Sequence, residues 1–207
     1  MSTPVNPTRY CFFAAGDADF FRAVADAERR YLAGFLASSD WELSTESVQS
    51  VPALRSQPGA MNVGLGAVAV VGLFITTCFG RKIFDEVYNR TLKRPIAAFL
   101  DSIFSARTQQ SSAPIQFQDV IHFEDINVVV VIQTDVRRSQ VAPIQKVLPE
   151  AWIVAHDYIQ RHGVKAPVHV HKIKAGQVSR QPELFESLHQ ARTPKRKQRA
   201  PKGKKDI

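Results

Sequence analysis

The sequence predicts an α+β protein in which a single transmembrane helix joins an N-terminal amphipathic helical segment to a small C-terminal ββαβ domain. Three observations lead to this fold class. Residues 61–79 are nineteen consecutive residues without a charge, apolar residues before and after them recur with helical spacing, and a two-residue alternation begins at residue 115. Because 44% of the 207 residues are hydrophobic, the chain has enough apolar material to fold.

Residues 1–60 are interpreted as an N-terminal helical segment. Residues 1–16 contain two prolines and a glycine and indicate an irregular start, and Asp17 has the chemistry of a helix N-cap. An amphipathic helix to about Ala37 is indicated by apolar residues at intervals of three and four, namely Phe20, Val24, Ala27, Tyr31 and Phe35.

The central apolar run, Met61 to Phe79, is closed by Gly80, Arg81 and Lys82. At about 1.5 Å per residue its nineteen residues come close to the ~30 Å of a bilayer's hydrocarbon layer, so a membrane-crossing helix is the first interpretation. A helix buried in a soluble core is the alternative, because the run is short and contains several glycines.

A third interpretation of the same run is a dinucleotide-binding turn. Gly64, Gly66 and Ala69 fit the G-x-G-x-x-A pattern, and Asp85 lies near the distance expected for an acid that binds ribose. The residues before Gly64 make a poor strand, however, and Asp85 falls in a helical pattern. The context therefore argues against this motif.

Small residues spaced by four give the predicted membrane helix a face suited to association with another helix. Such a face lets two backbones approach closely. Its members are Ala60, Gly64, Val68, Gly72 and Thr76.

Charge is distributed unevenly on the two sides of the apolar run. Residues 1–60 carry five Lys or Arg and seven Asp or Glu, a balance of −2, whereas residues 80–207 carry 22 and 12, a balance of +10. Because basic flanks stay on the cytoplasmic side of a membrane, we expect the C-terminal part to be cytoplasmic. The N-terminal sixty residues would then have to be translocated without a cleavable signal peptide.

Residues 80–106 continue with helical periodicity and carry basic residues off the apolar face, which predicts a basic amphipathic juxtamembrane helix. Pro95 predicts a kink or a new helix start. Residues 107–114 (RTQQSSAP) are a polar linker and mark a domain boundary.

Residues 115–176 are predicted to form the ββαβ domain. Ile115, Phe117, Ile121 and Phe123 alternate with other residues, which predicts a half-buried strand, and the β-branched run 127–134 predicts a central strand. Helical spacing follows, with Pro149 suited to the first turn and Gly163 to the position after the end, and a third strand covers 168–173. One helix covers only one face of such a sheet, so we expect homo-oligomerisation or a protein partner on the exposed face.

The C-terminal residues 177–207 are interpreted as a short helical patch (Leu184, Phe185 and Leu188) followed by a disordered polybasic tail. The tail can bind the phosphates of anionic lipid or of nucleic acid. Lipid is favoured because no aromatic residue is available to stack on bases and because a membrane anchor is predicted nearby. The cationic residues are Lys195, Arg196, Lys197, Arg199, Lys202, Lys204 and Lys205.

The histidines offer a metal-site hypothesis. His169 and His171 lie two apart on a predicted strand and therefore face the same way, as do His122 and Glu124 at the end of another. If those strands are neighbours, the four groups could hold Zn²⁺. Solvated histidines on an exposed sheet face are the alternative. Neither a catalytic motif nor a disulfide framework is recognisable, so we expect no enzymatic activity and no cofactor.

Together these patterns predict a non-enzymatic single-pass membrane protein, acting as a membrane effector or anchored adaptor that self-assembles through its helix face and its cytoplasmic module. A soluble α/β binding protein or dinucleotide-dependent enzyme is the alternative, and a nucleic-acid-binding protein that uses the basic tail is a further one. The expected partners are membrane lipids, a second copy of the chain and a protein on the exposed sheet face.

Overall fold

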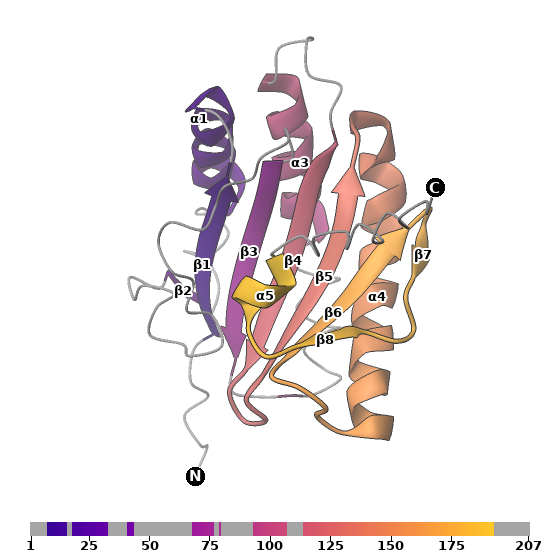
Figure 1. The fold of residues 1–207 in the computed structure, drawn as a ribbon. Helices are drawn as coiled ribbons and strands as arrows, with labels where there is room; N and C mark the ends of the chain where they lie inside the picture. Colours follow the sequence, from indigo (N-terminus) through magenta and orange to yellow (C-terminus); the bar gives the residue numbers. More distant parts are fainter. Residues whose placement is uncertain are drawn as a thin grey trace, which may run out of the picture.

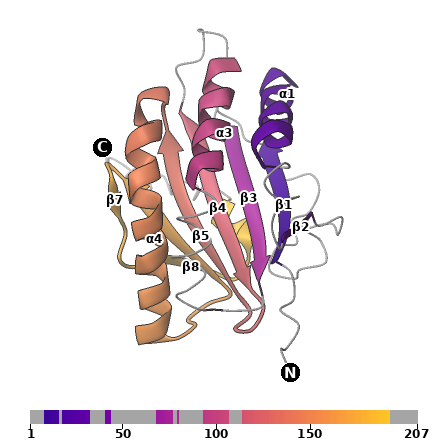
Figure 2. The same ribbon diagram turned by 180° about the vertical axis from the view of Figure 1, so that it is seen from behind.

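The computed structural model describes residues 8–15, 18–32, 41–43, 68–76, 79, 93–106 and 114–192. Within these residues the protein is α+β, with a mixed sheet that has long helices on one face and a short C-terminal segment crossing the other (Figures 1 and 2).

The sheet is built around five longer strands: β1 (Thr8–Ala15), β3 (Val68–Thr76), β4 (Ile115–Phe123), β5 (Val128–Val136) and β6 (Val168–Lys174). Three short strands extend it: β2 (Trp41–Leu43), β7 (Gln177–Val178) and β8 (Glu183–Phe185). The order across the sheet is β2-β1-β3-β4-β5-β6-β7, and β8 also pairs with β6.

Strand directions alternate between parallel and antiparallel pairs. β3 is parallel to β4 and β5 is parallel to β6, whereas β1 and β3, and likewise β4 and β5, are antiparallel. The β4–β5 pair closes through a turn at residues 124–127, and β6 returns to β7 through Ala175 and Gly176, both at positive φ, as a tight two-residue hairpin turn requires.

The helices are α1 (Ala18–Ala27), extended by a π-helical turn (Glu28–Leu32), α3 (Lys93–Ala106), α4 (Val141–His162), preceded by a 3₁₀ turn (Arg138–Gln140), and α5 (Leu188–Arg192). The three longer helices lie side by side on one face, and α5 lies on the other (Figures 1 and 2). The core lies between α3, α4 and β4 to β6, and it includes Phe99, Leu100, Ile103, Ile121, Val130, Ile132, Leu148 and Trp152.

The two parallel crossovers have opposite hands. The chain moves in the same direction across the sheet from β3 to β4 and from β5 to β6. The strands β5 and β6, however, run antiparallel to β3 and β4, while the helices α3 and α4 that cover the two crossovers lie on the same face (Figure 2). The β5–α4–β6 crossover is the left-handed one, a hand that about 2% of such units adopt.

The predicted transmembrane helix at 61–79 is wrong for the part of the run that is described. Val68–Thr76 is strand β3, which pairs with β1 on one side and β4 on the other. A strand inside a sheet can be as uniformly apolar as a helix of that length, so composition could not separate the two. None of the helices formed by the described residues combines the length and apolarity needed to cross a bilayer.

Both other interpretations of this run also fail here, because each needs helical backbone. Ala69 lies in β3 rather than in the first turn of a helix, and Gly64 and Gly66 lie outside the described residues. The helix-association face is not formed either: Val68, Gly72 and Thr76 are strand residues, and Ala60 and Gly64 lie outside the described residues.

Other segments match the expectations in part. Residues 8–15, expected to be irregular, form β1, whereas the amphipathic helix is confirmed over 18–32. α3 covers Lys93–Ala106, whereas residues 80–92 of the predicted helix lie outside the described residues, so the break expected at Pro95 stays a prediction. The linker at 107–113 and the tail from 193 lie outside the described residues.

The order strand, strand, helix, strand is found from residue 115, and β5 is central as expected. The helix begins at Val141, however, so Pro149 is interior and does not mark the first turn, whereas Gly163 does cap the end with φ 70°. Leu184 and Phe185, expected to be helical, lie in β8. The sheet also continues past β4 into β3 and β1.

Candidate functional site

The most unusual chemistry of the described residues lies under α4, where β6 presents two histidines. His169 pairs with Val130 and His171 with Ile132, both core residues, so the imidazoles lie on the helix-covered face. Both side chains are fully buried. Tyr158 of α4 packs edge-on against both, with ring centroids 5.8 Å and 6.0 Å away, and also contacts His162 at 4.7 Å.

The hydrogen bonds of His171 define its tautomer. Its Nδ1 lies 2.9 Å from the carbonyl oxygen of Ser179, and since a carbonyl can only accept, Nδ1 carries the proton and donates it. Nε2 then holds a lone pair, and this buried atom has no hydrogen-bond partner among the described residues. The ring therefore fastens the segment after β7 to the middle of β6.

Nε2 of His169 is a hydrogen-bond acceptor, unlike Nδ1 of His171. The backbone N–H groups of Lys165 and Ala166 both donate to Nε2, each across 3.4 Å. An atom that accepts from two donors carries a lone pair, so the proton of this imidazole is on Nδ1, which is also buried without a partner among the described residues. His169 is thus an acceptor for the loop that connects α4 to β6.

Burial is the main reason that both imidazoles are neutral. It lowers the pKa of His169 to about 4, and the neighbouring His171 adds to this effect. The pKa of His171 is lowered by burial as well, while its hydrogen bond to Ser179 opposes the shift. Neither ring is charged near neutral pH.

Ser179 closes the gap between β7 and β8 along the edge of β6. Its N–H donates to the carbonyl oxygen of Lys172 (2.9 Å), and the Lys172 N–H donates to its Oγ (2.8 Å). Lys172 also forms an ion pair with Glu183 of β8 at 2.7 Å. We call residues 177–192 the C-terminal strap, because this segment runs from the β6 edge across the sheet face that α4 does not cover (Figure 1).

A buried carboxyl lies on the same face as the histidines. Asp119 of β4 is 2% exposed, and its Oδ2 accepts the indole N–H of Trp152 across 2.9 Å. Burial raises the pKa of Asp119 to about 7, and the Trp152 hydrogen bond opposes that rise. In the register of the sheet, Asp119 and His171 flank Ile132.

The four residues of the metal hypothesis are not brought together. β5 lies between β4 and β6, so the strands are not neighbours, and His122 pairs with Val129 on the face opposite to His169 and His171. Glu124 lies in the β4–β5 turn. Across the part of the chain that the structure describes, no group of three or more His, Cys, Asp and Glu could hold a metal ion.

Sequence reasoning missed Asp119, Trp152, Tyr158 and Ser179. The sequence contains one signal for Asp119. Residues 115, 117, 119, 121 and 123 point to the same face of the strand, and all of them except Asp119 are apolar, so the carboxyl group is expected to face the core. Nothing local indicates that Ser179 would meet His171, because this contact depends on the strap.

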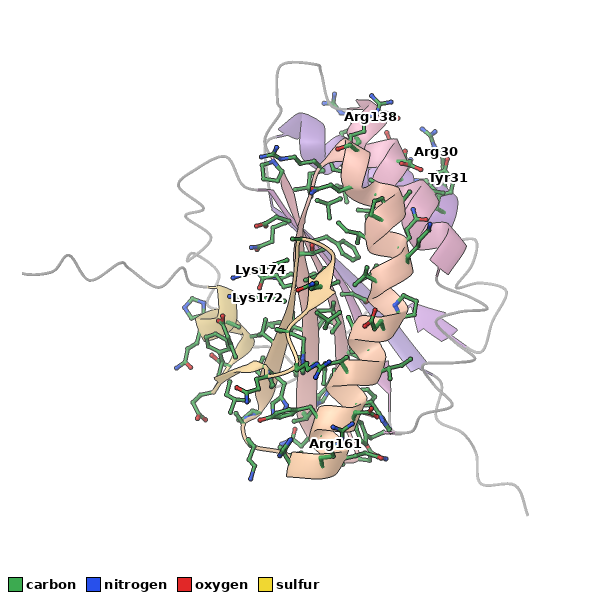
Figure 3. All side chains as sticks on the ribbon, turned by 90° about the vertical axis from the view of Figure 1, so that its right-hand side faces the viewer. Arg30, Tyr31, Arg138, Arg161, Lys172 and Lys174 are labelled. Carbon is green, nitrogen blue, oxygen red and sulfur yellow. The ribbon has the colours of Figure 1, made fainter. Side chains whose placement is uncertain are left out.

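The basic side chains of the folded part are spread over separate surfaces. Arg138 and Arg161 lie near opposite ends of α4, while Lys172 and Lys174 lie on the other side of the sheet (Figure 3). Two of them are engaged locally, since Arg161 forms an ion pair with Asp157 and Lys172 with Glu183. The cationic tail residues lie outside the described residues.

The fold and site therefore define a class, an α+β protein with a one-sided helical layer and a buried pair of histidines packed against a half-buried tyrosine. Comparisons with models of protein families, with curated proteins and with solved structures find no match.

Proposed function

We propose that this protein is a non-enzymatic binding protein that attaches peripherally to anionic membrane surfaces through its C-terminal tail. The observation that carries the proposal is the segregation of charge. Residues 114–192 hold nine Lys or Arg and eight Asp or Glu, a balance of +1, whereas residues 193–207 hold seven and one, a balance of +6. Most of the chain's +8 thus lies in fifteen residues at one end.

The chemistry of the tail suits a diffuse layer of phosphate. Each Lys or Arg near an anionic lipid surface contributes about 1 kcal/mol, so seven of them supply useful affinity together without any defined pocket. Such attraction falls off within a Debye length, about 8 Å at physiological ionic strength. Binding of this kind must therefore weaken steeply with salt.

Two features favour lipid over nucleic acid. The stretch from 193 to 205 has no aromatic residue that could stack on bases. Within the described residues 114–192 the charges are nearly balanced, and Arg138, Arg161, Lys172 and Lys174 lie apart rather than together on one face (Figure 3). A nucleic-acid-binding domain commonly combines a tail with a basic face.

We propose membrane localisation only in this peripheral form, because residues 68–76 of the apolar run form strand β3 rather than a helical anchor. Self-assembly, proposed from the thin sheet, would have to use a surface other than the small-residue helix face predicted at 60–76. The size of the full-length protein in solution tests it directly.

The experiment is co-sedimentation of the full-length protein with vesicles of phosphatidylcholine alone or with one-third phosphatidylserine, over a salt series. We expect binding only to the anionic vesicles and its loss as salt rises. Deletion of 193–207 should abolish this binding. Replacing Lys195, Lys197, Lys202 and Lys204 by arginine, which keeps the charge, should not. Binding that is equal on both vesicles, or stronger on a DNA duplex at matched phosphate concentration, overturns the proposal.

A further inference from the structure

One imidazole ring, that of His169, holds the centre of the loop between α4 and β6. Residues 163–167 form this loop, and its two ends are fixed by backbone: the Gly163 N–H donates to the Ile159 carbonyl oxygen, and the Pro167 carbonyl oxygen accepts from Val129, both across 2.8 Å. Between them the Lys165 and Ala166 N–H groups both donate to Nε2 of His169. The centre of the loop is thus held by one lone pair.

Proton uptake by that lone pair reverses the interaction. A proton on Nε2 turns the acceptor into a third donor facing two backbone N–H groups, and the loop loses its central hydrogen bonds. Because the buried Ala166 N–H would be left without a partner, which is unfavourable, the loop is expected to leave the ring rather than stay beside it.

The groups around His169 do not compensate a positive charge. Tyr158 and, beyond it, His162 face it from α4, and His171 follows on the same strand. Val130 of β5 and Leu184 of β8 pair with it and are apolar. Lys165 in the loop is cationic, and the nearest acid of β8, Glu183, is bound by Lys172. α5 lies on the opposite face of the sheet (Figure 1).

We propose that His169 is an acid-sensitive latch, which in its neutral form holds loop 163–167 against β6 and on proton uptake releases it. The release loosens the end of α4 and the β6 edge, where His171 fastens the C-terminal strap. This device is independent of what the tail binds, and it gives the protein a conformational response to acidification.

Amide hydrogen exchange of the full-length protein tests the latch residue by residue. After correction for the intrinsic pH dependence, protection of the Lys165 and Ala166 amides should fall about 10- to 100-fold between about pH 7 and pH 4.5, because the opened ring recovers an ordinary affinity for protons. Protection of the Ile132 amide in β5 should fall much less. Unchanged protection at 165 and 166 overturns the proposal.

Two variants separate the latch from general acid damage. In His169→Gln the amide oxygen takes the place of Nε2 as an acceptor that does not titrate, so protection of the loop should become independent of pH. In His171→Asn the side-chain N–H can still donate to Ser179, and the loop should keep its acid response. Equal acid sensitivity of His169→Gln and wild type contradicts the latch.

The tautomer provides a check that needs no variant. Long-range ¹H–¹⁵N correlation spectra at neutral pH should show His169 with its proton on Nδ1. A proton on Nε2 would remove the acceptor and overturn the proposal.

Discussion

The indole N–H of Trp152 donates to the carboxylate of Asp119 across 2.9 Å, joining α4 to β4 inside the core. This buried hydrogen bond ties the long helix to the middle of the sheet. A tryptophan N–H is a donor only, so it stabilises Asp119 best when the carboxyl is ionised. The pair therefore makes stability depend on pH at the centre of the fold.

Asp119→Asn should stabilise the protein above neutral pH. The folded pKa of Asp119, about 7, exceeds its unfolded value of 3.8, so the stability this group contributes is full below pH 3.8 and is lost as pH rises through 7. The asparagine oxygen still accepts from Trp152 without carrying a charge. Urea unfolding should show a gain of about 2–4 kcal/mol near pH 8 and little difference near pH 4. A loss of stability near pH 8 would contradict the buried charge.

Trp152→Phe should destabilise the protein more when Asp119 is ionised. The variant leaves a buried carboxylate without its donor, which should cost about 2–4 kcal/mol near pH 8. In a double-mutant cycle with Asp119→Asn, the coupling energy should be about 1–3 kcal/mol near pH 8 and smaller near pH 4. A coupling energy that does not change with pH would show that packing alone links the two residues.

Protonation of the two histidines should lower the stability of the protein as the pH falls, and Asp119 should partly offset this loss. The folded pKa of His169, about 4, lies below the ordinary 6.5, so its contribution is full above pH 6.5 and is lost as pH falls to 4. His171 shifts in the same direction. Over this window Asp119 acts with the opposite sign. Asp119→Asn should therefore lose roughly 2–3 kcal/mol between pH 6.5 and 4, while wild type changes less.

That comparison has an internal control. In the double variant Asp119→Asn, His169→Gln, stability should change much less between pH 6.5 and 4 than in Asp119→Asn alone, because both titrating groups are gone. If its acid loss equals that of Asp119→Asn alone, His169 is not the source of the lability.

Ser179→Ala should loosen the C-terminal strap without unfolding the sheet. The alanine removes the Oγ acceptor of the Lys172 N–H, at a cost of about 1 kcal/mol, while the backbone bonds of residue 179 to Lys172 and His171 stay. Amide exchange at Lys172 should become faster. Ser187→Ala is the matched control, since Ser187 Oγ accepts only an exposed N–H, that of Gln190, at 3.3 Å. Equal effects of the two variants would argue against the role given to Ser179.

Ala175→Asn should raise the melting temperature. Ala175 and Gly176 occupy the β6–β7 turn at φ 50° and φ 75°, a left-handed conformation that asparagine tolerates better than alanine. Gly176→Ala should lower it, and because a Cβ there meets nothing within 4 Å, the loss of about 1 kcal/mol would be conformational. Opposite shifts in the two variants are the expected result, and shifts of the same sign contradict the turn.

Local sequence patterns predict much of the fold after residue 114. The alternation from Ile115, the β-branched run that became β5 and the glycine that caps α4 all act within a few residues, so their elements were predictable. Pro149 suits a first turn and so predicts a later start for α4, yet the helix begins at Val141 and contains this proline in its interior. The left-handed crossover through α4 has no local signature.

The charge-free run 61–79, the shared face of His169 and His171 and the concentration of cationic charge at the C-terminal end can all be read from the sequence. That Val68–Thr76 is a strand depends on tertiary contacts, because its partners β1 and β4 lie some fifty residues away on either side. Tertiary contacts also decide which face the histidines share and that His122 lies on the other. Periodicity reports how one segment meets its surroundings, whereas strand order and register are set by contacts between segments that no local pattern contains.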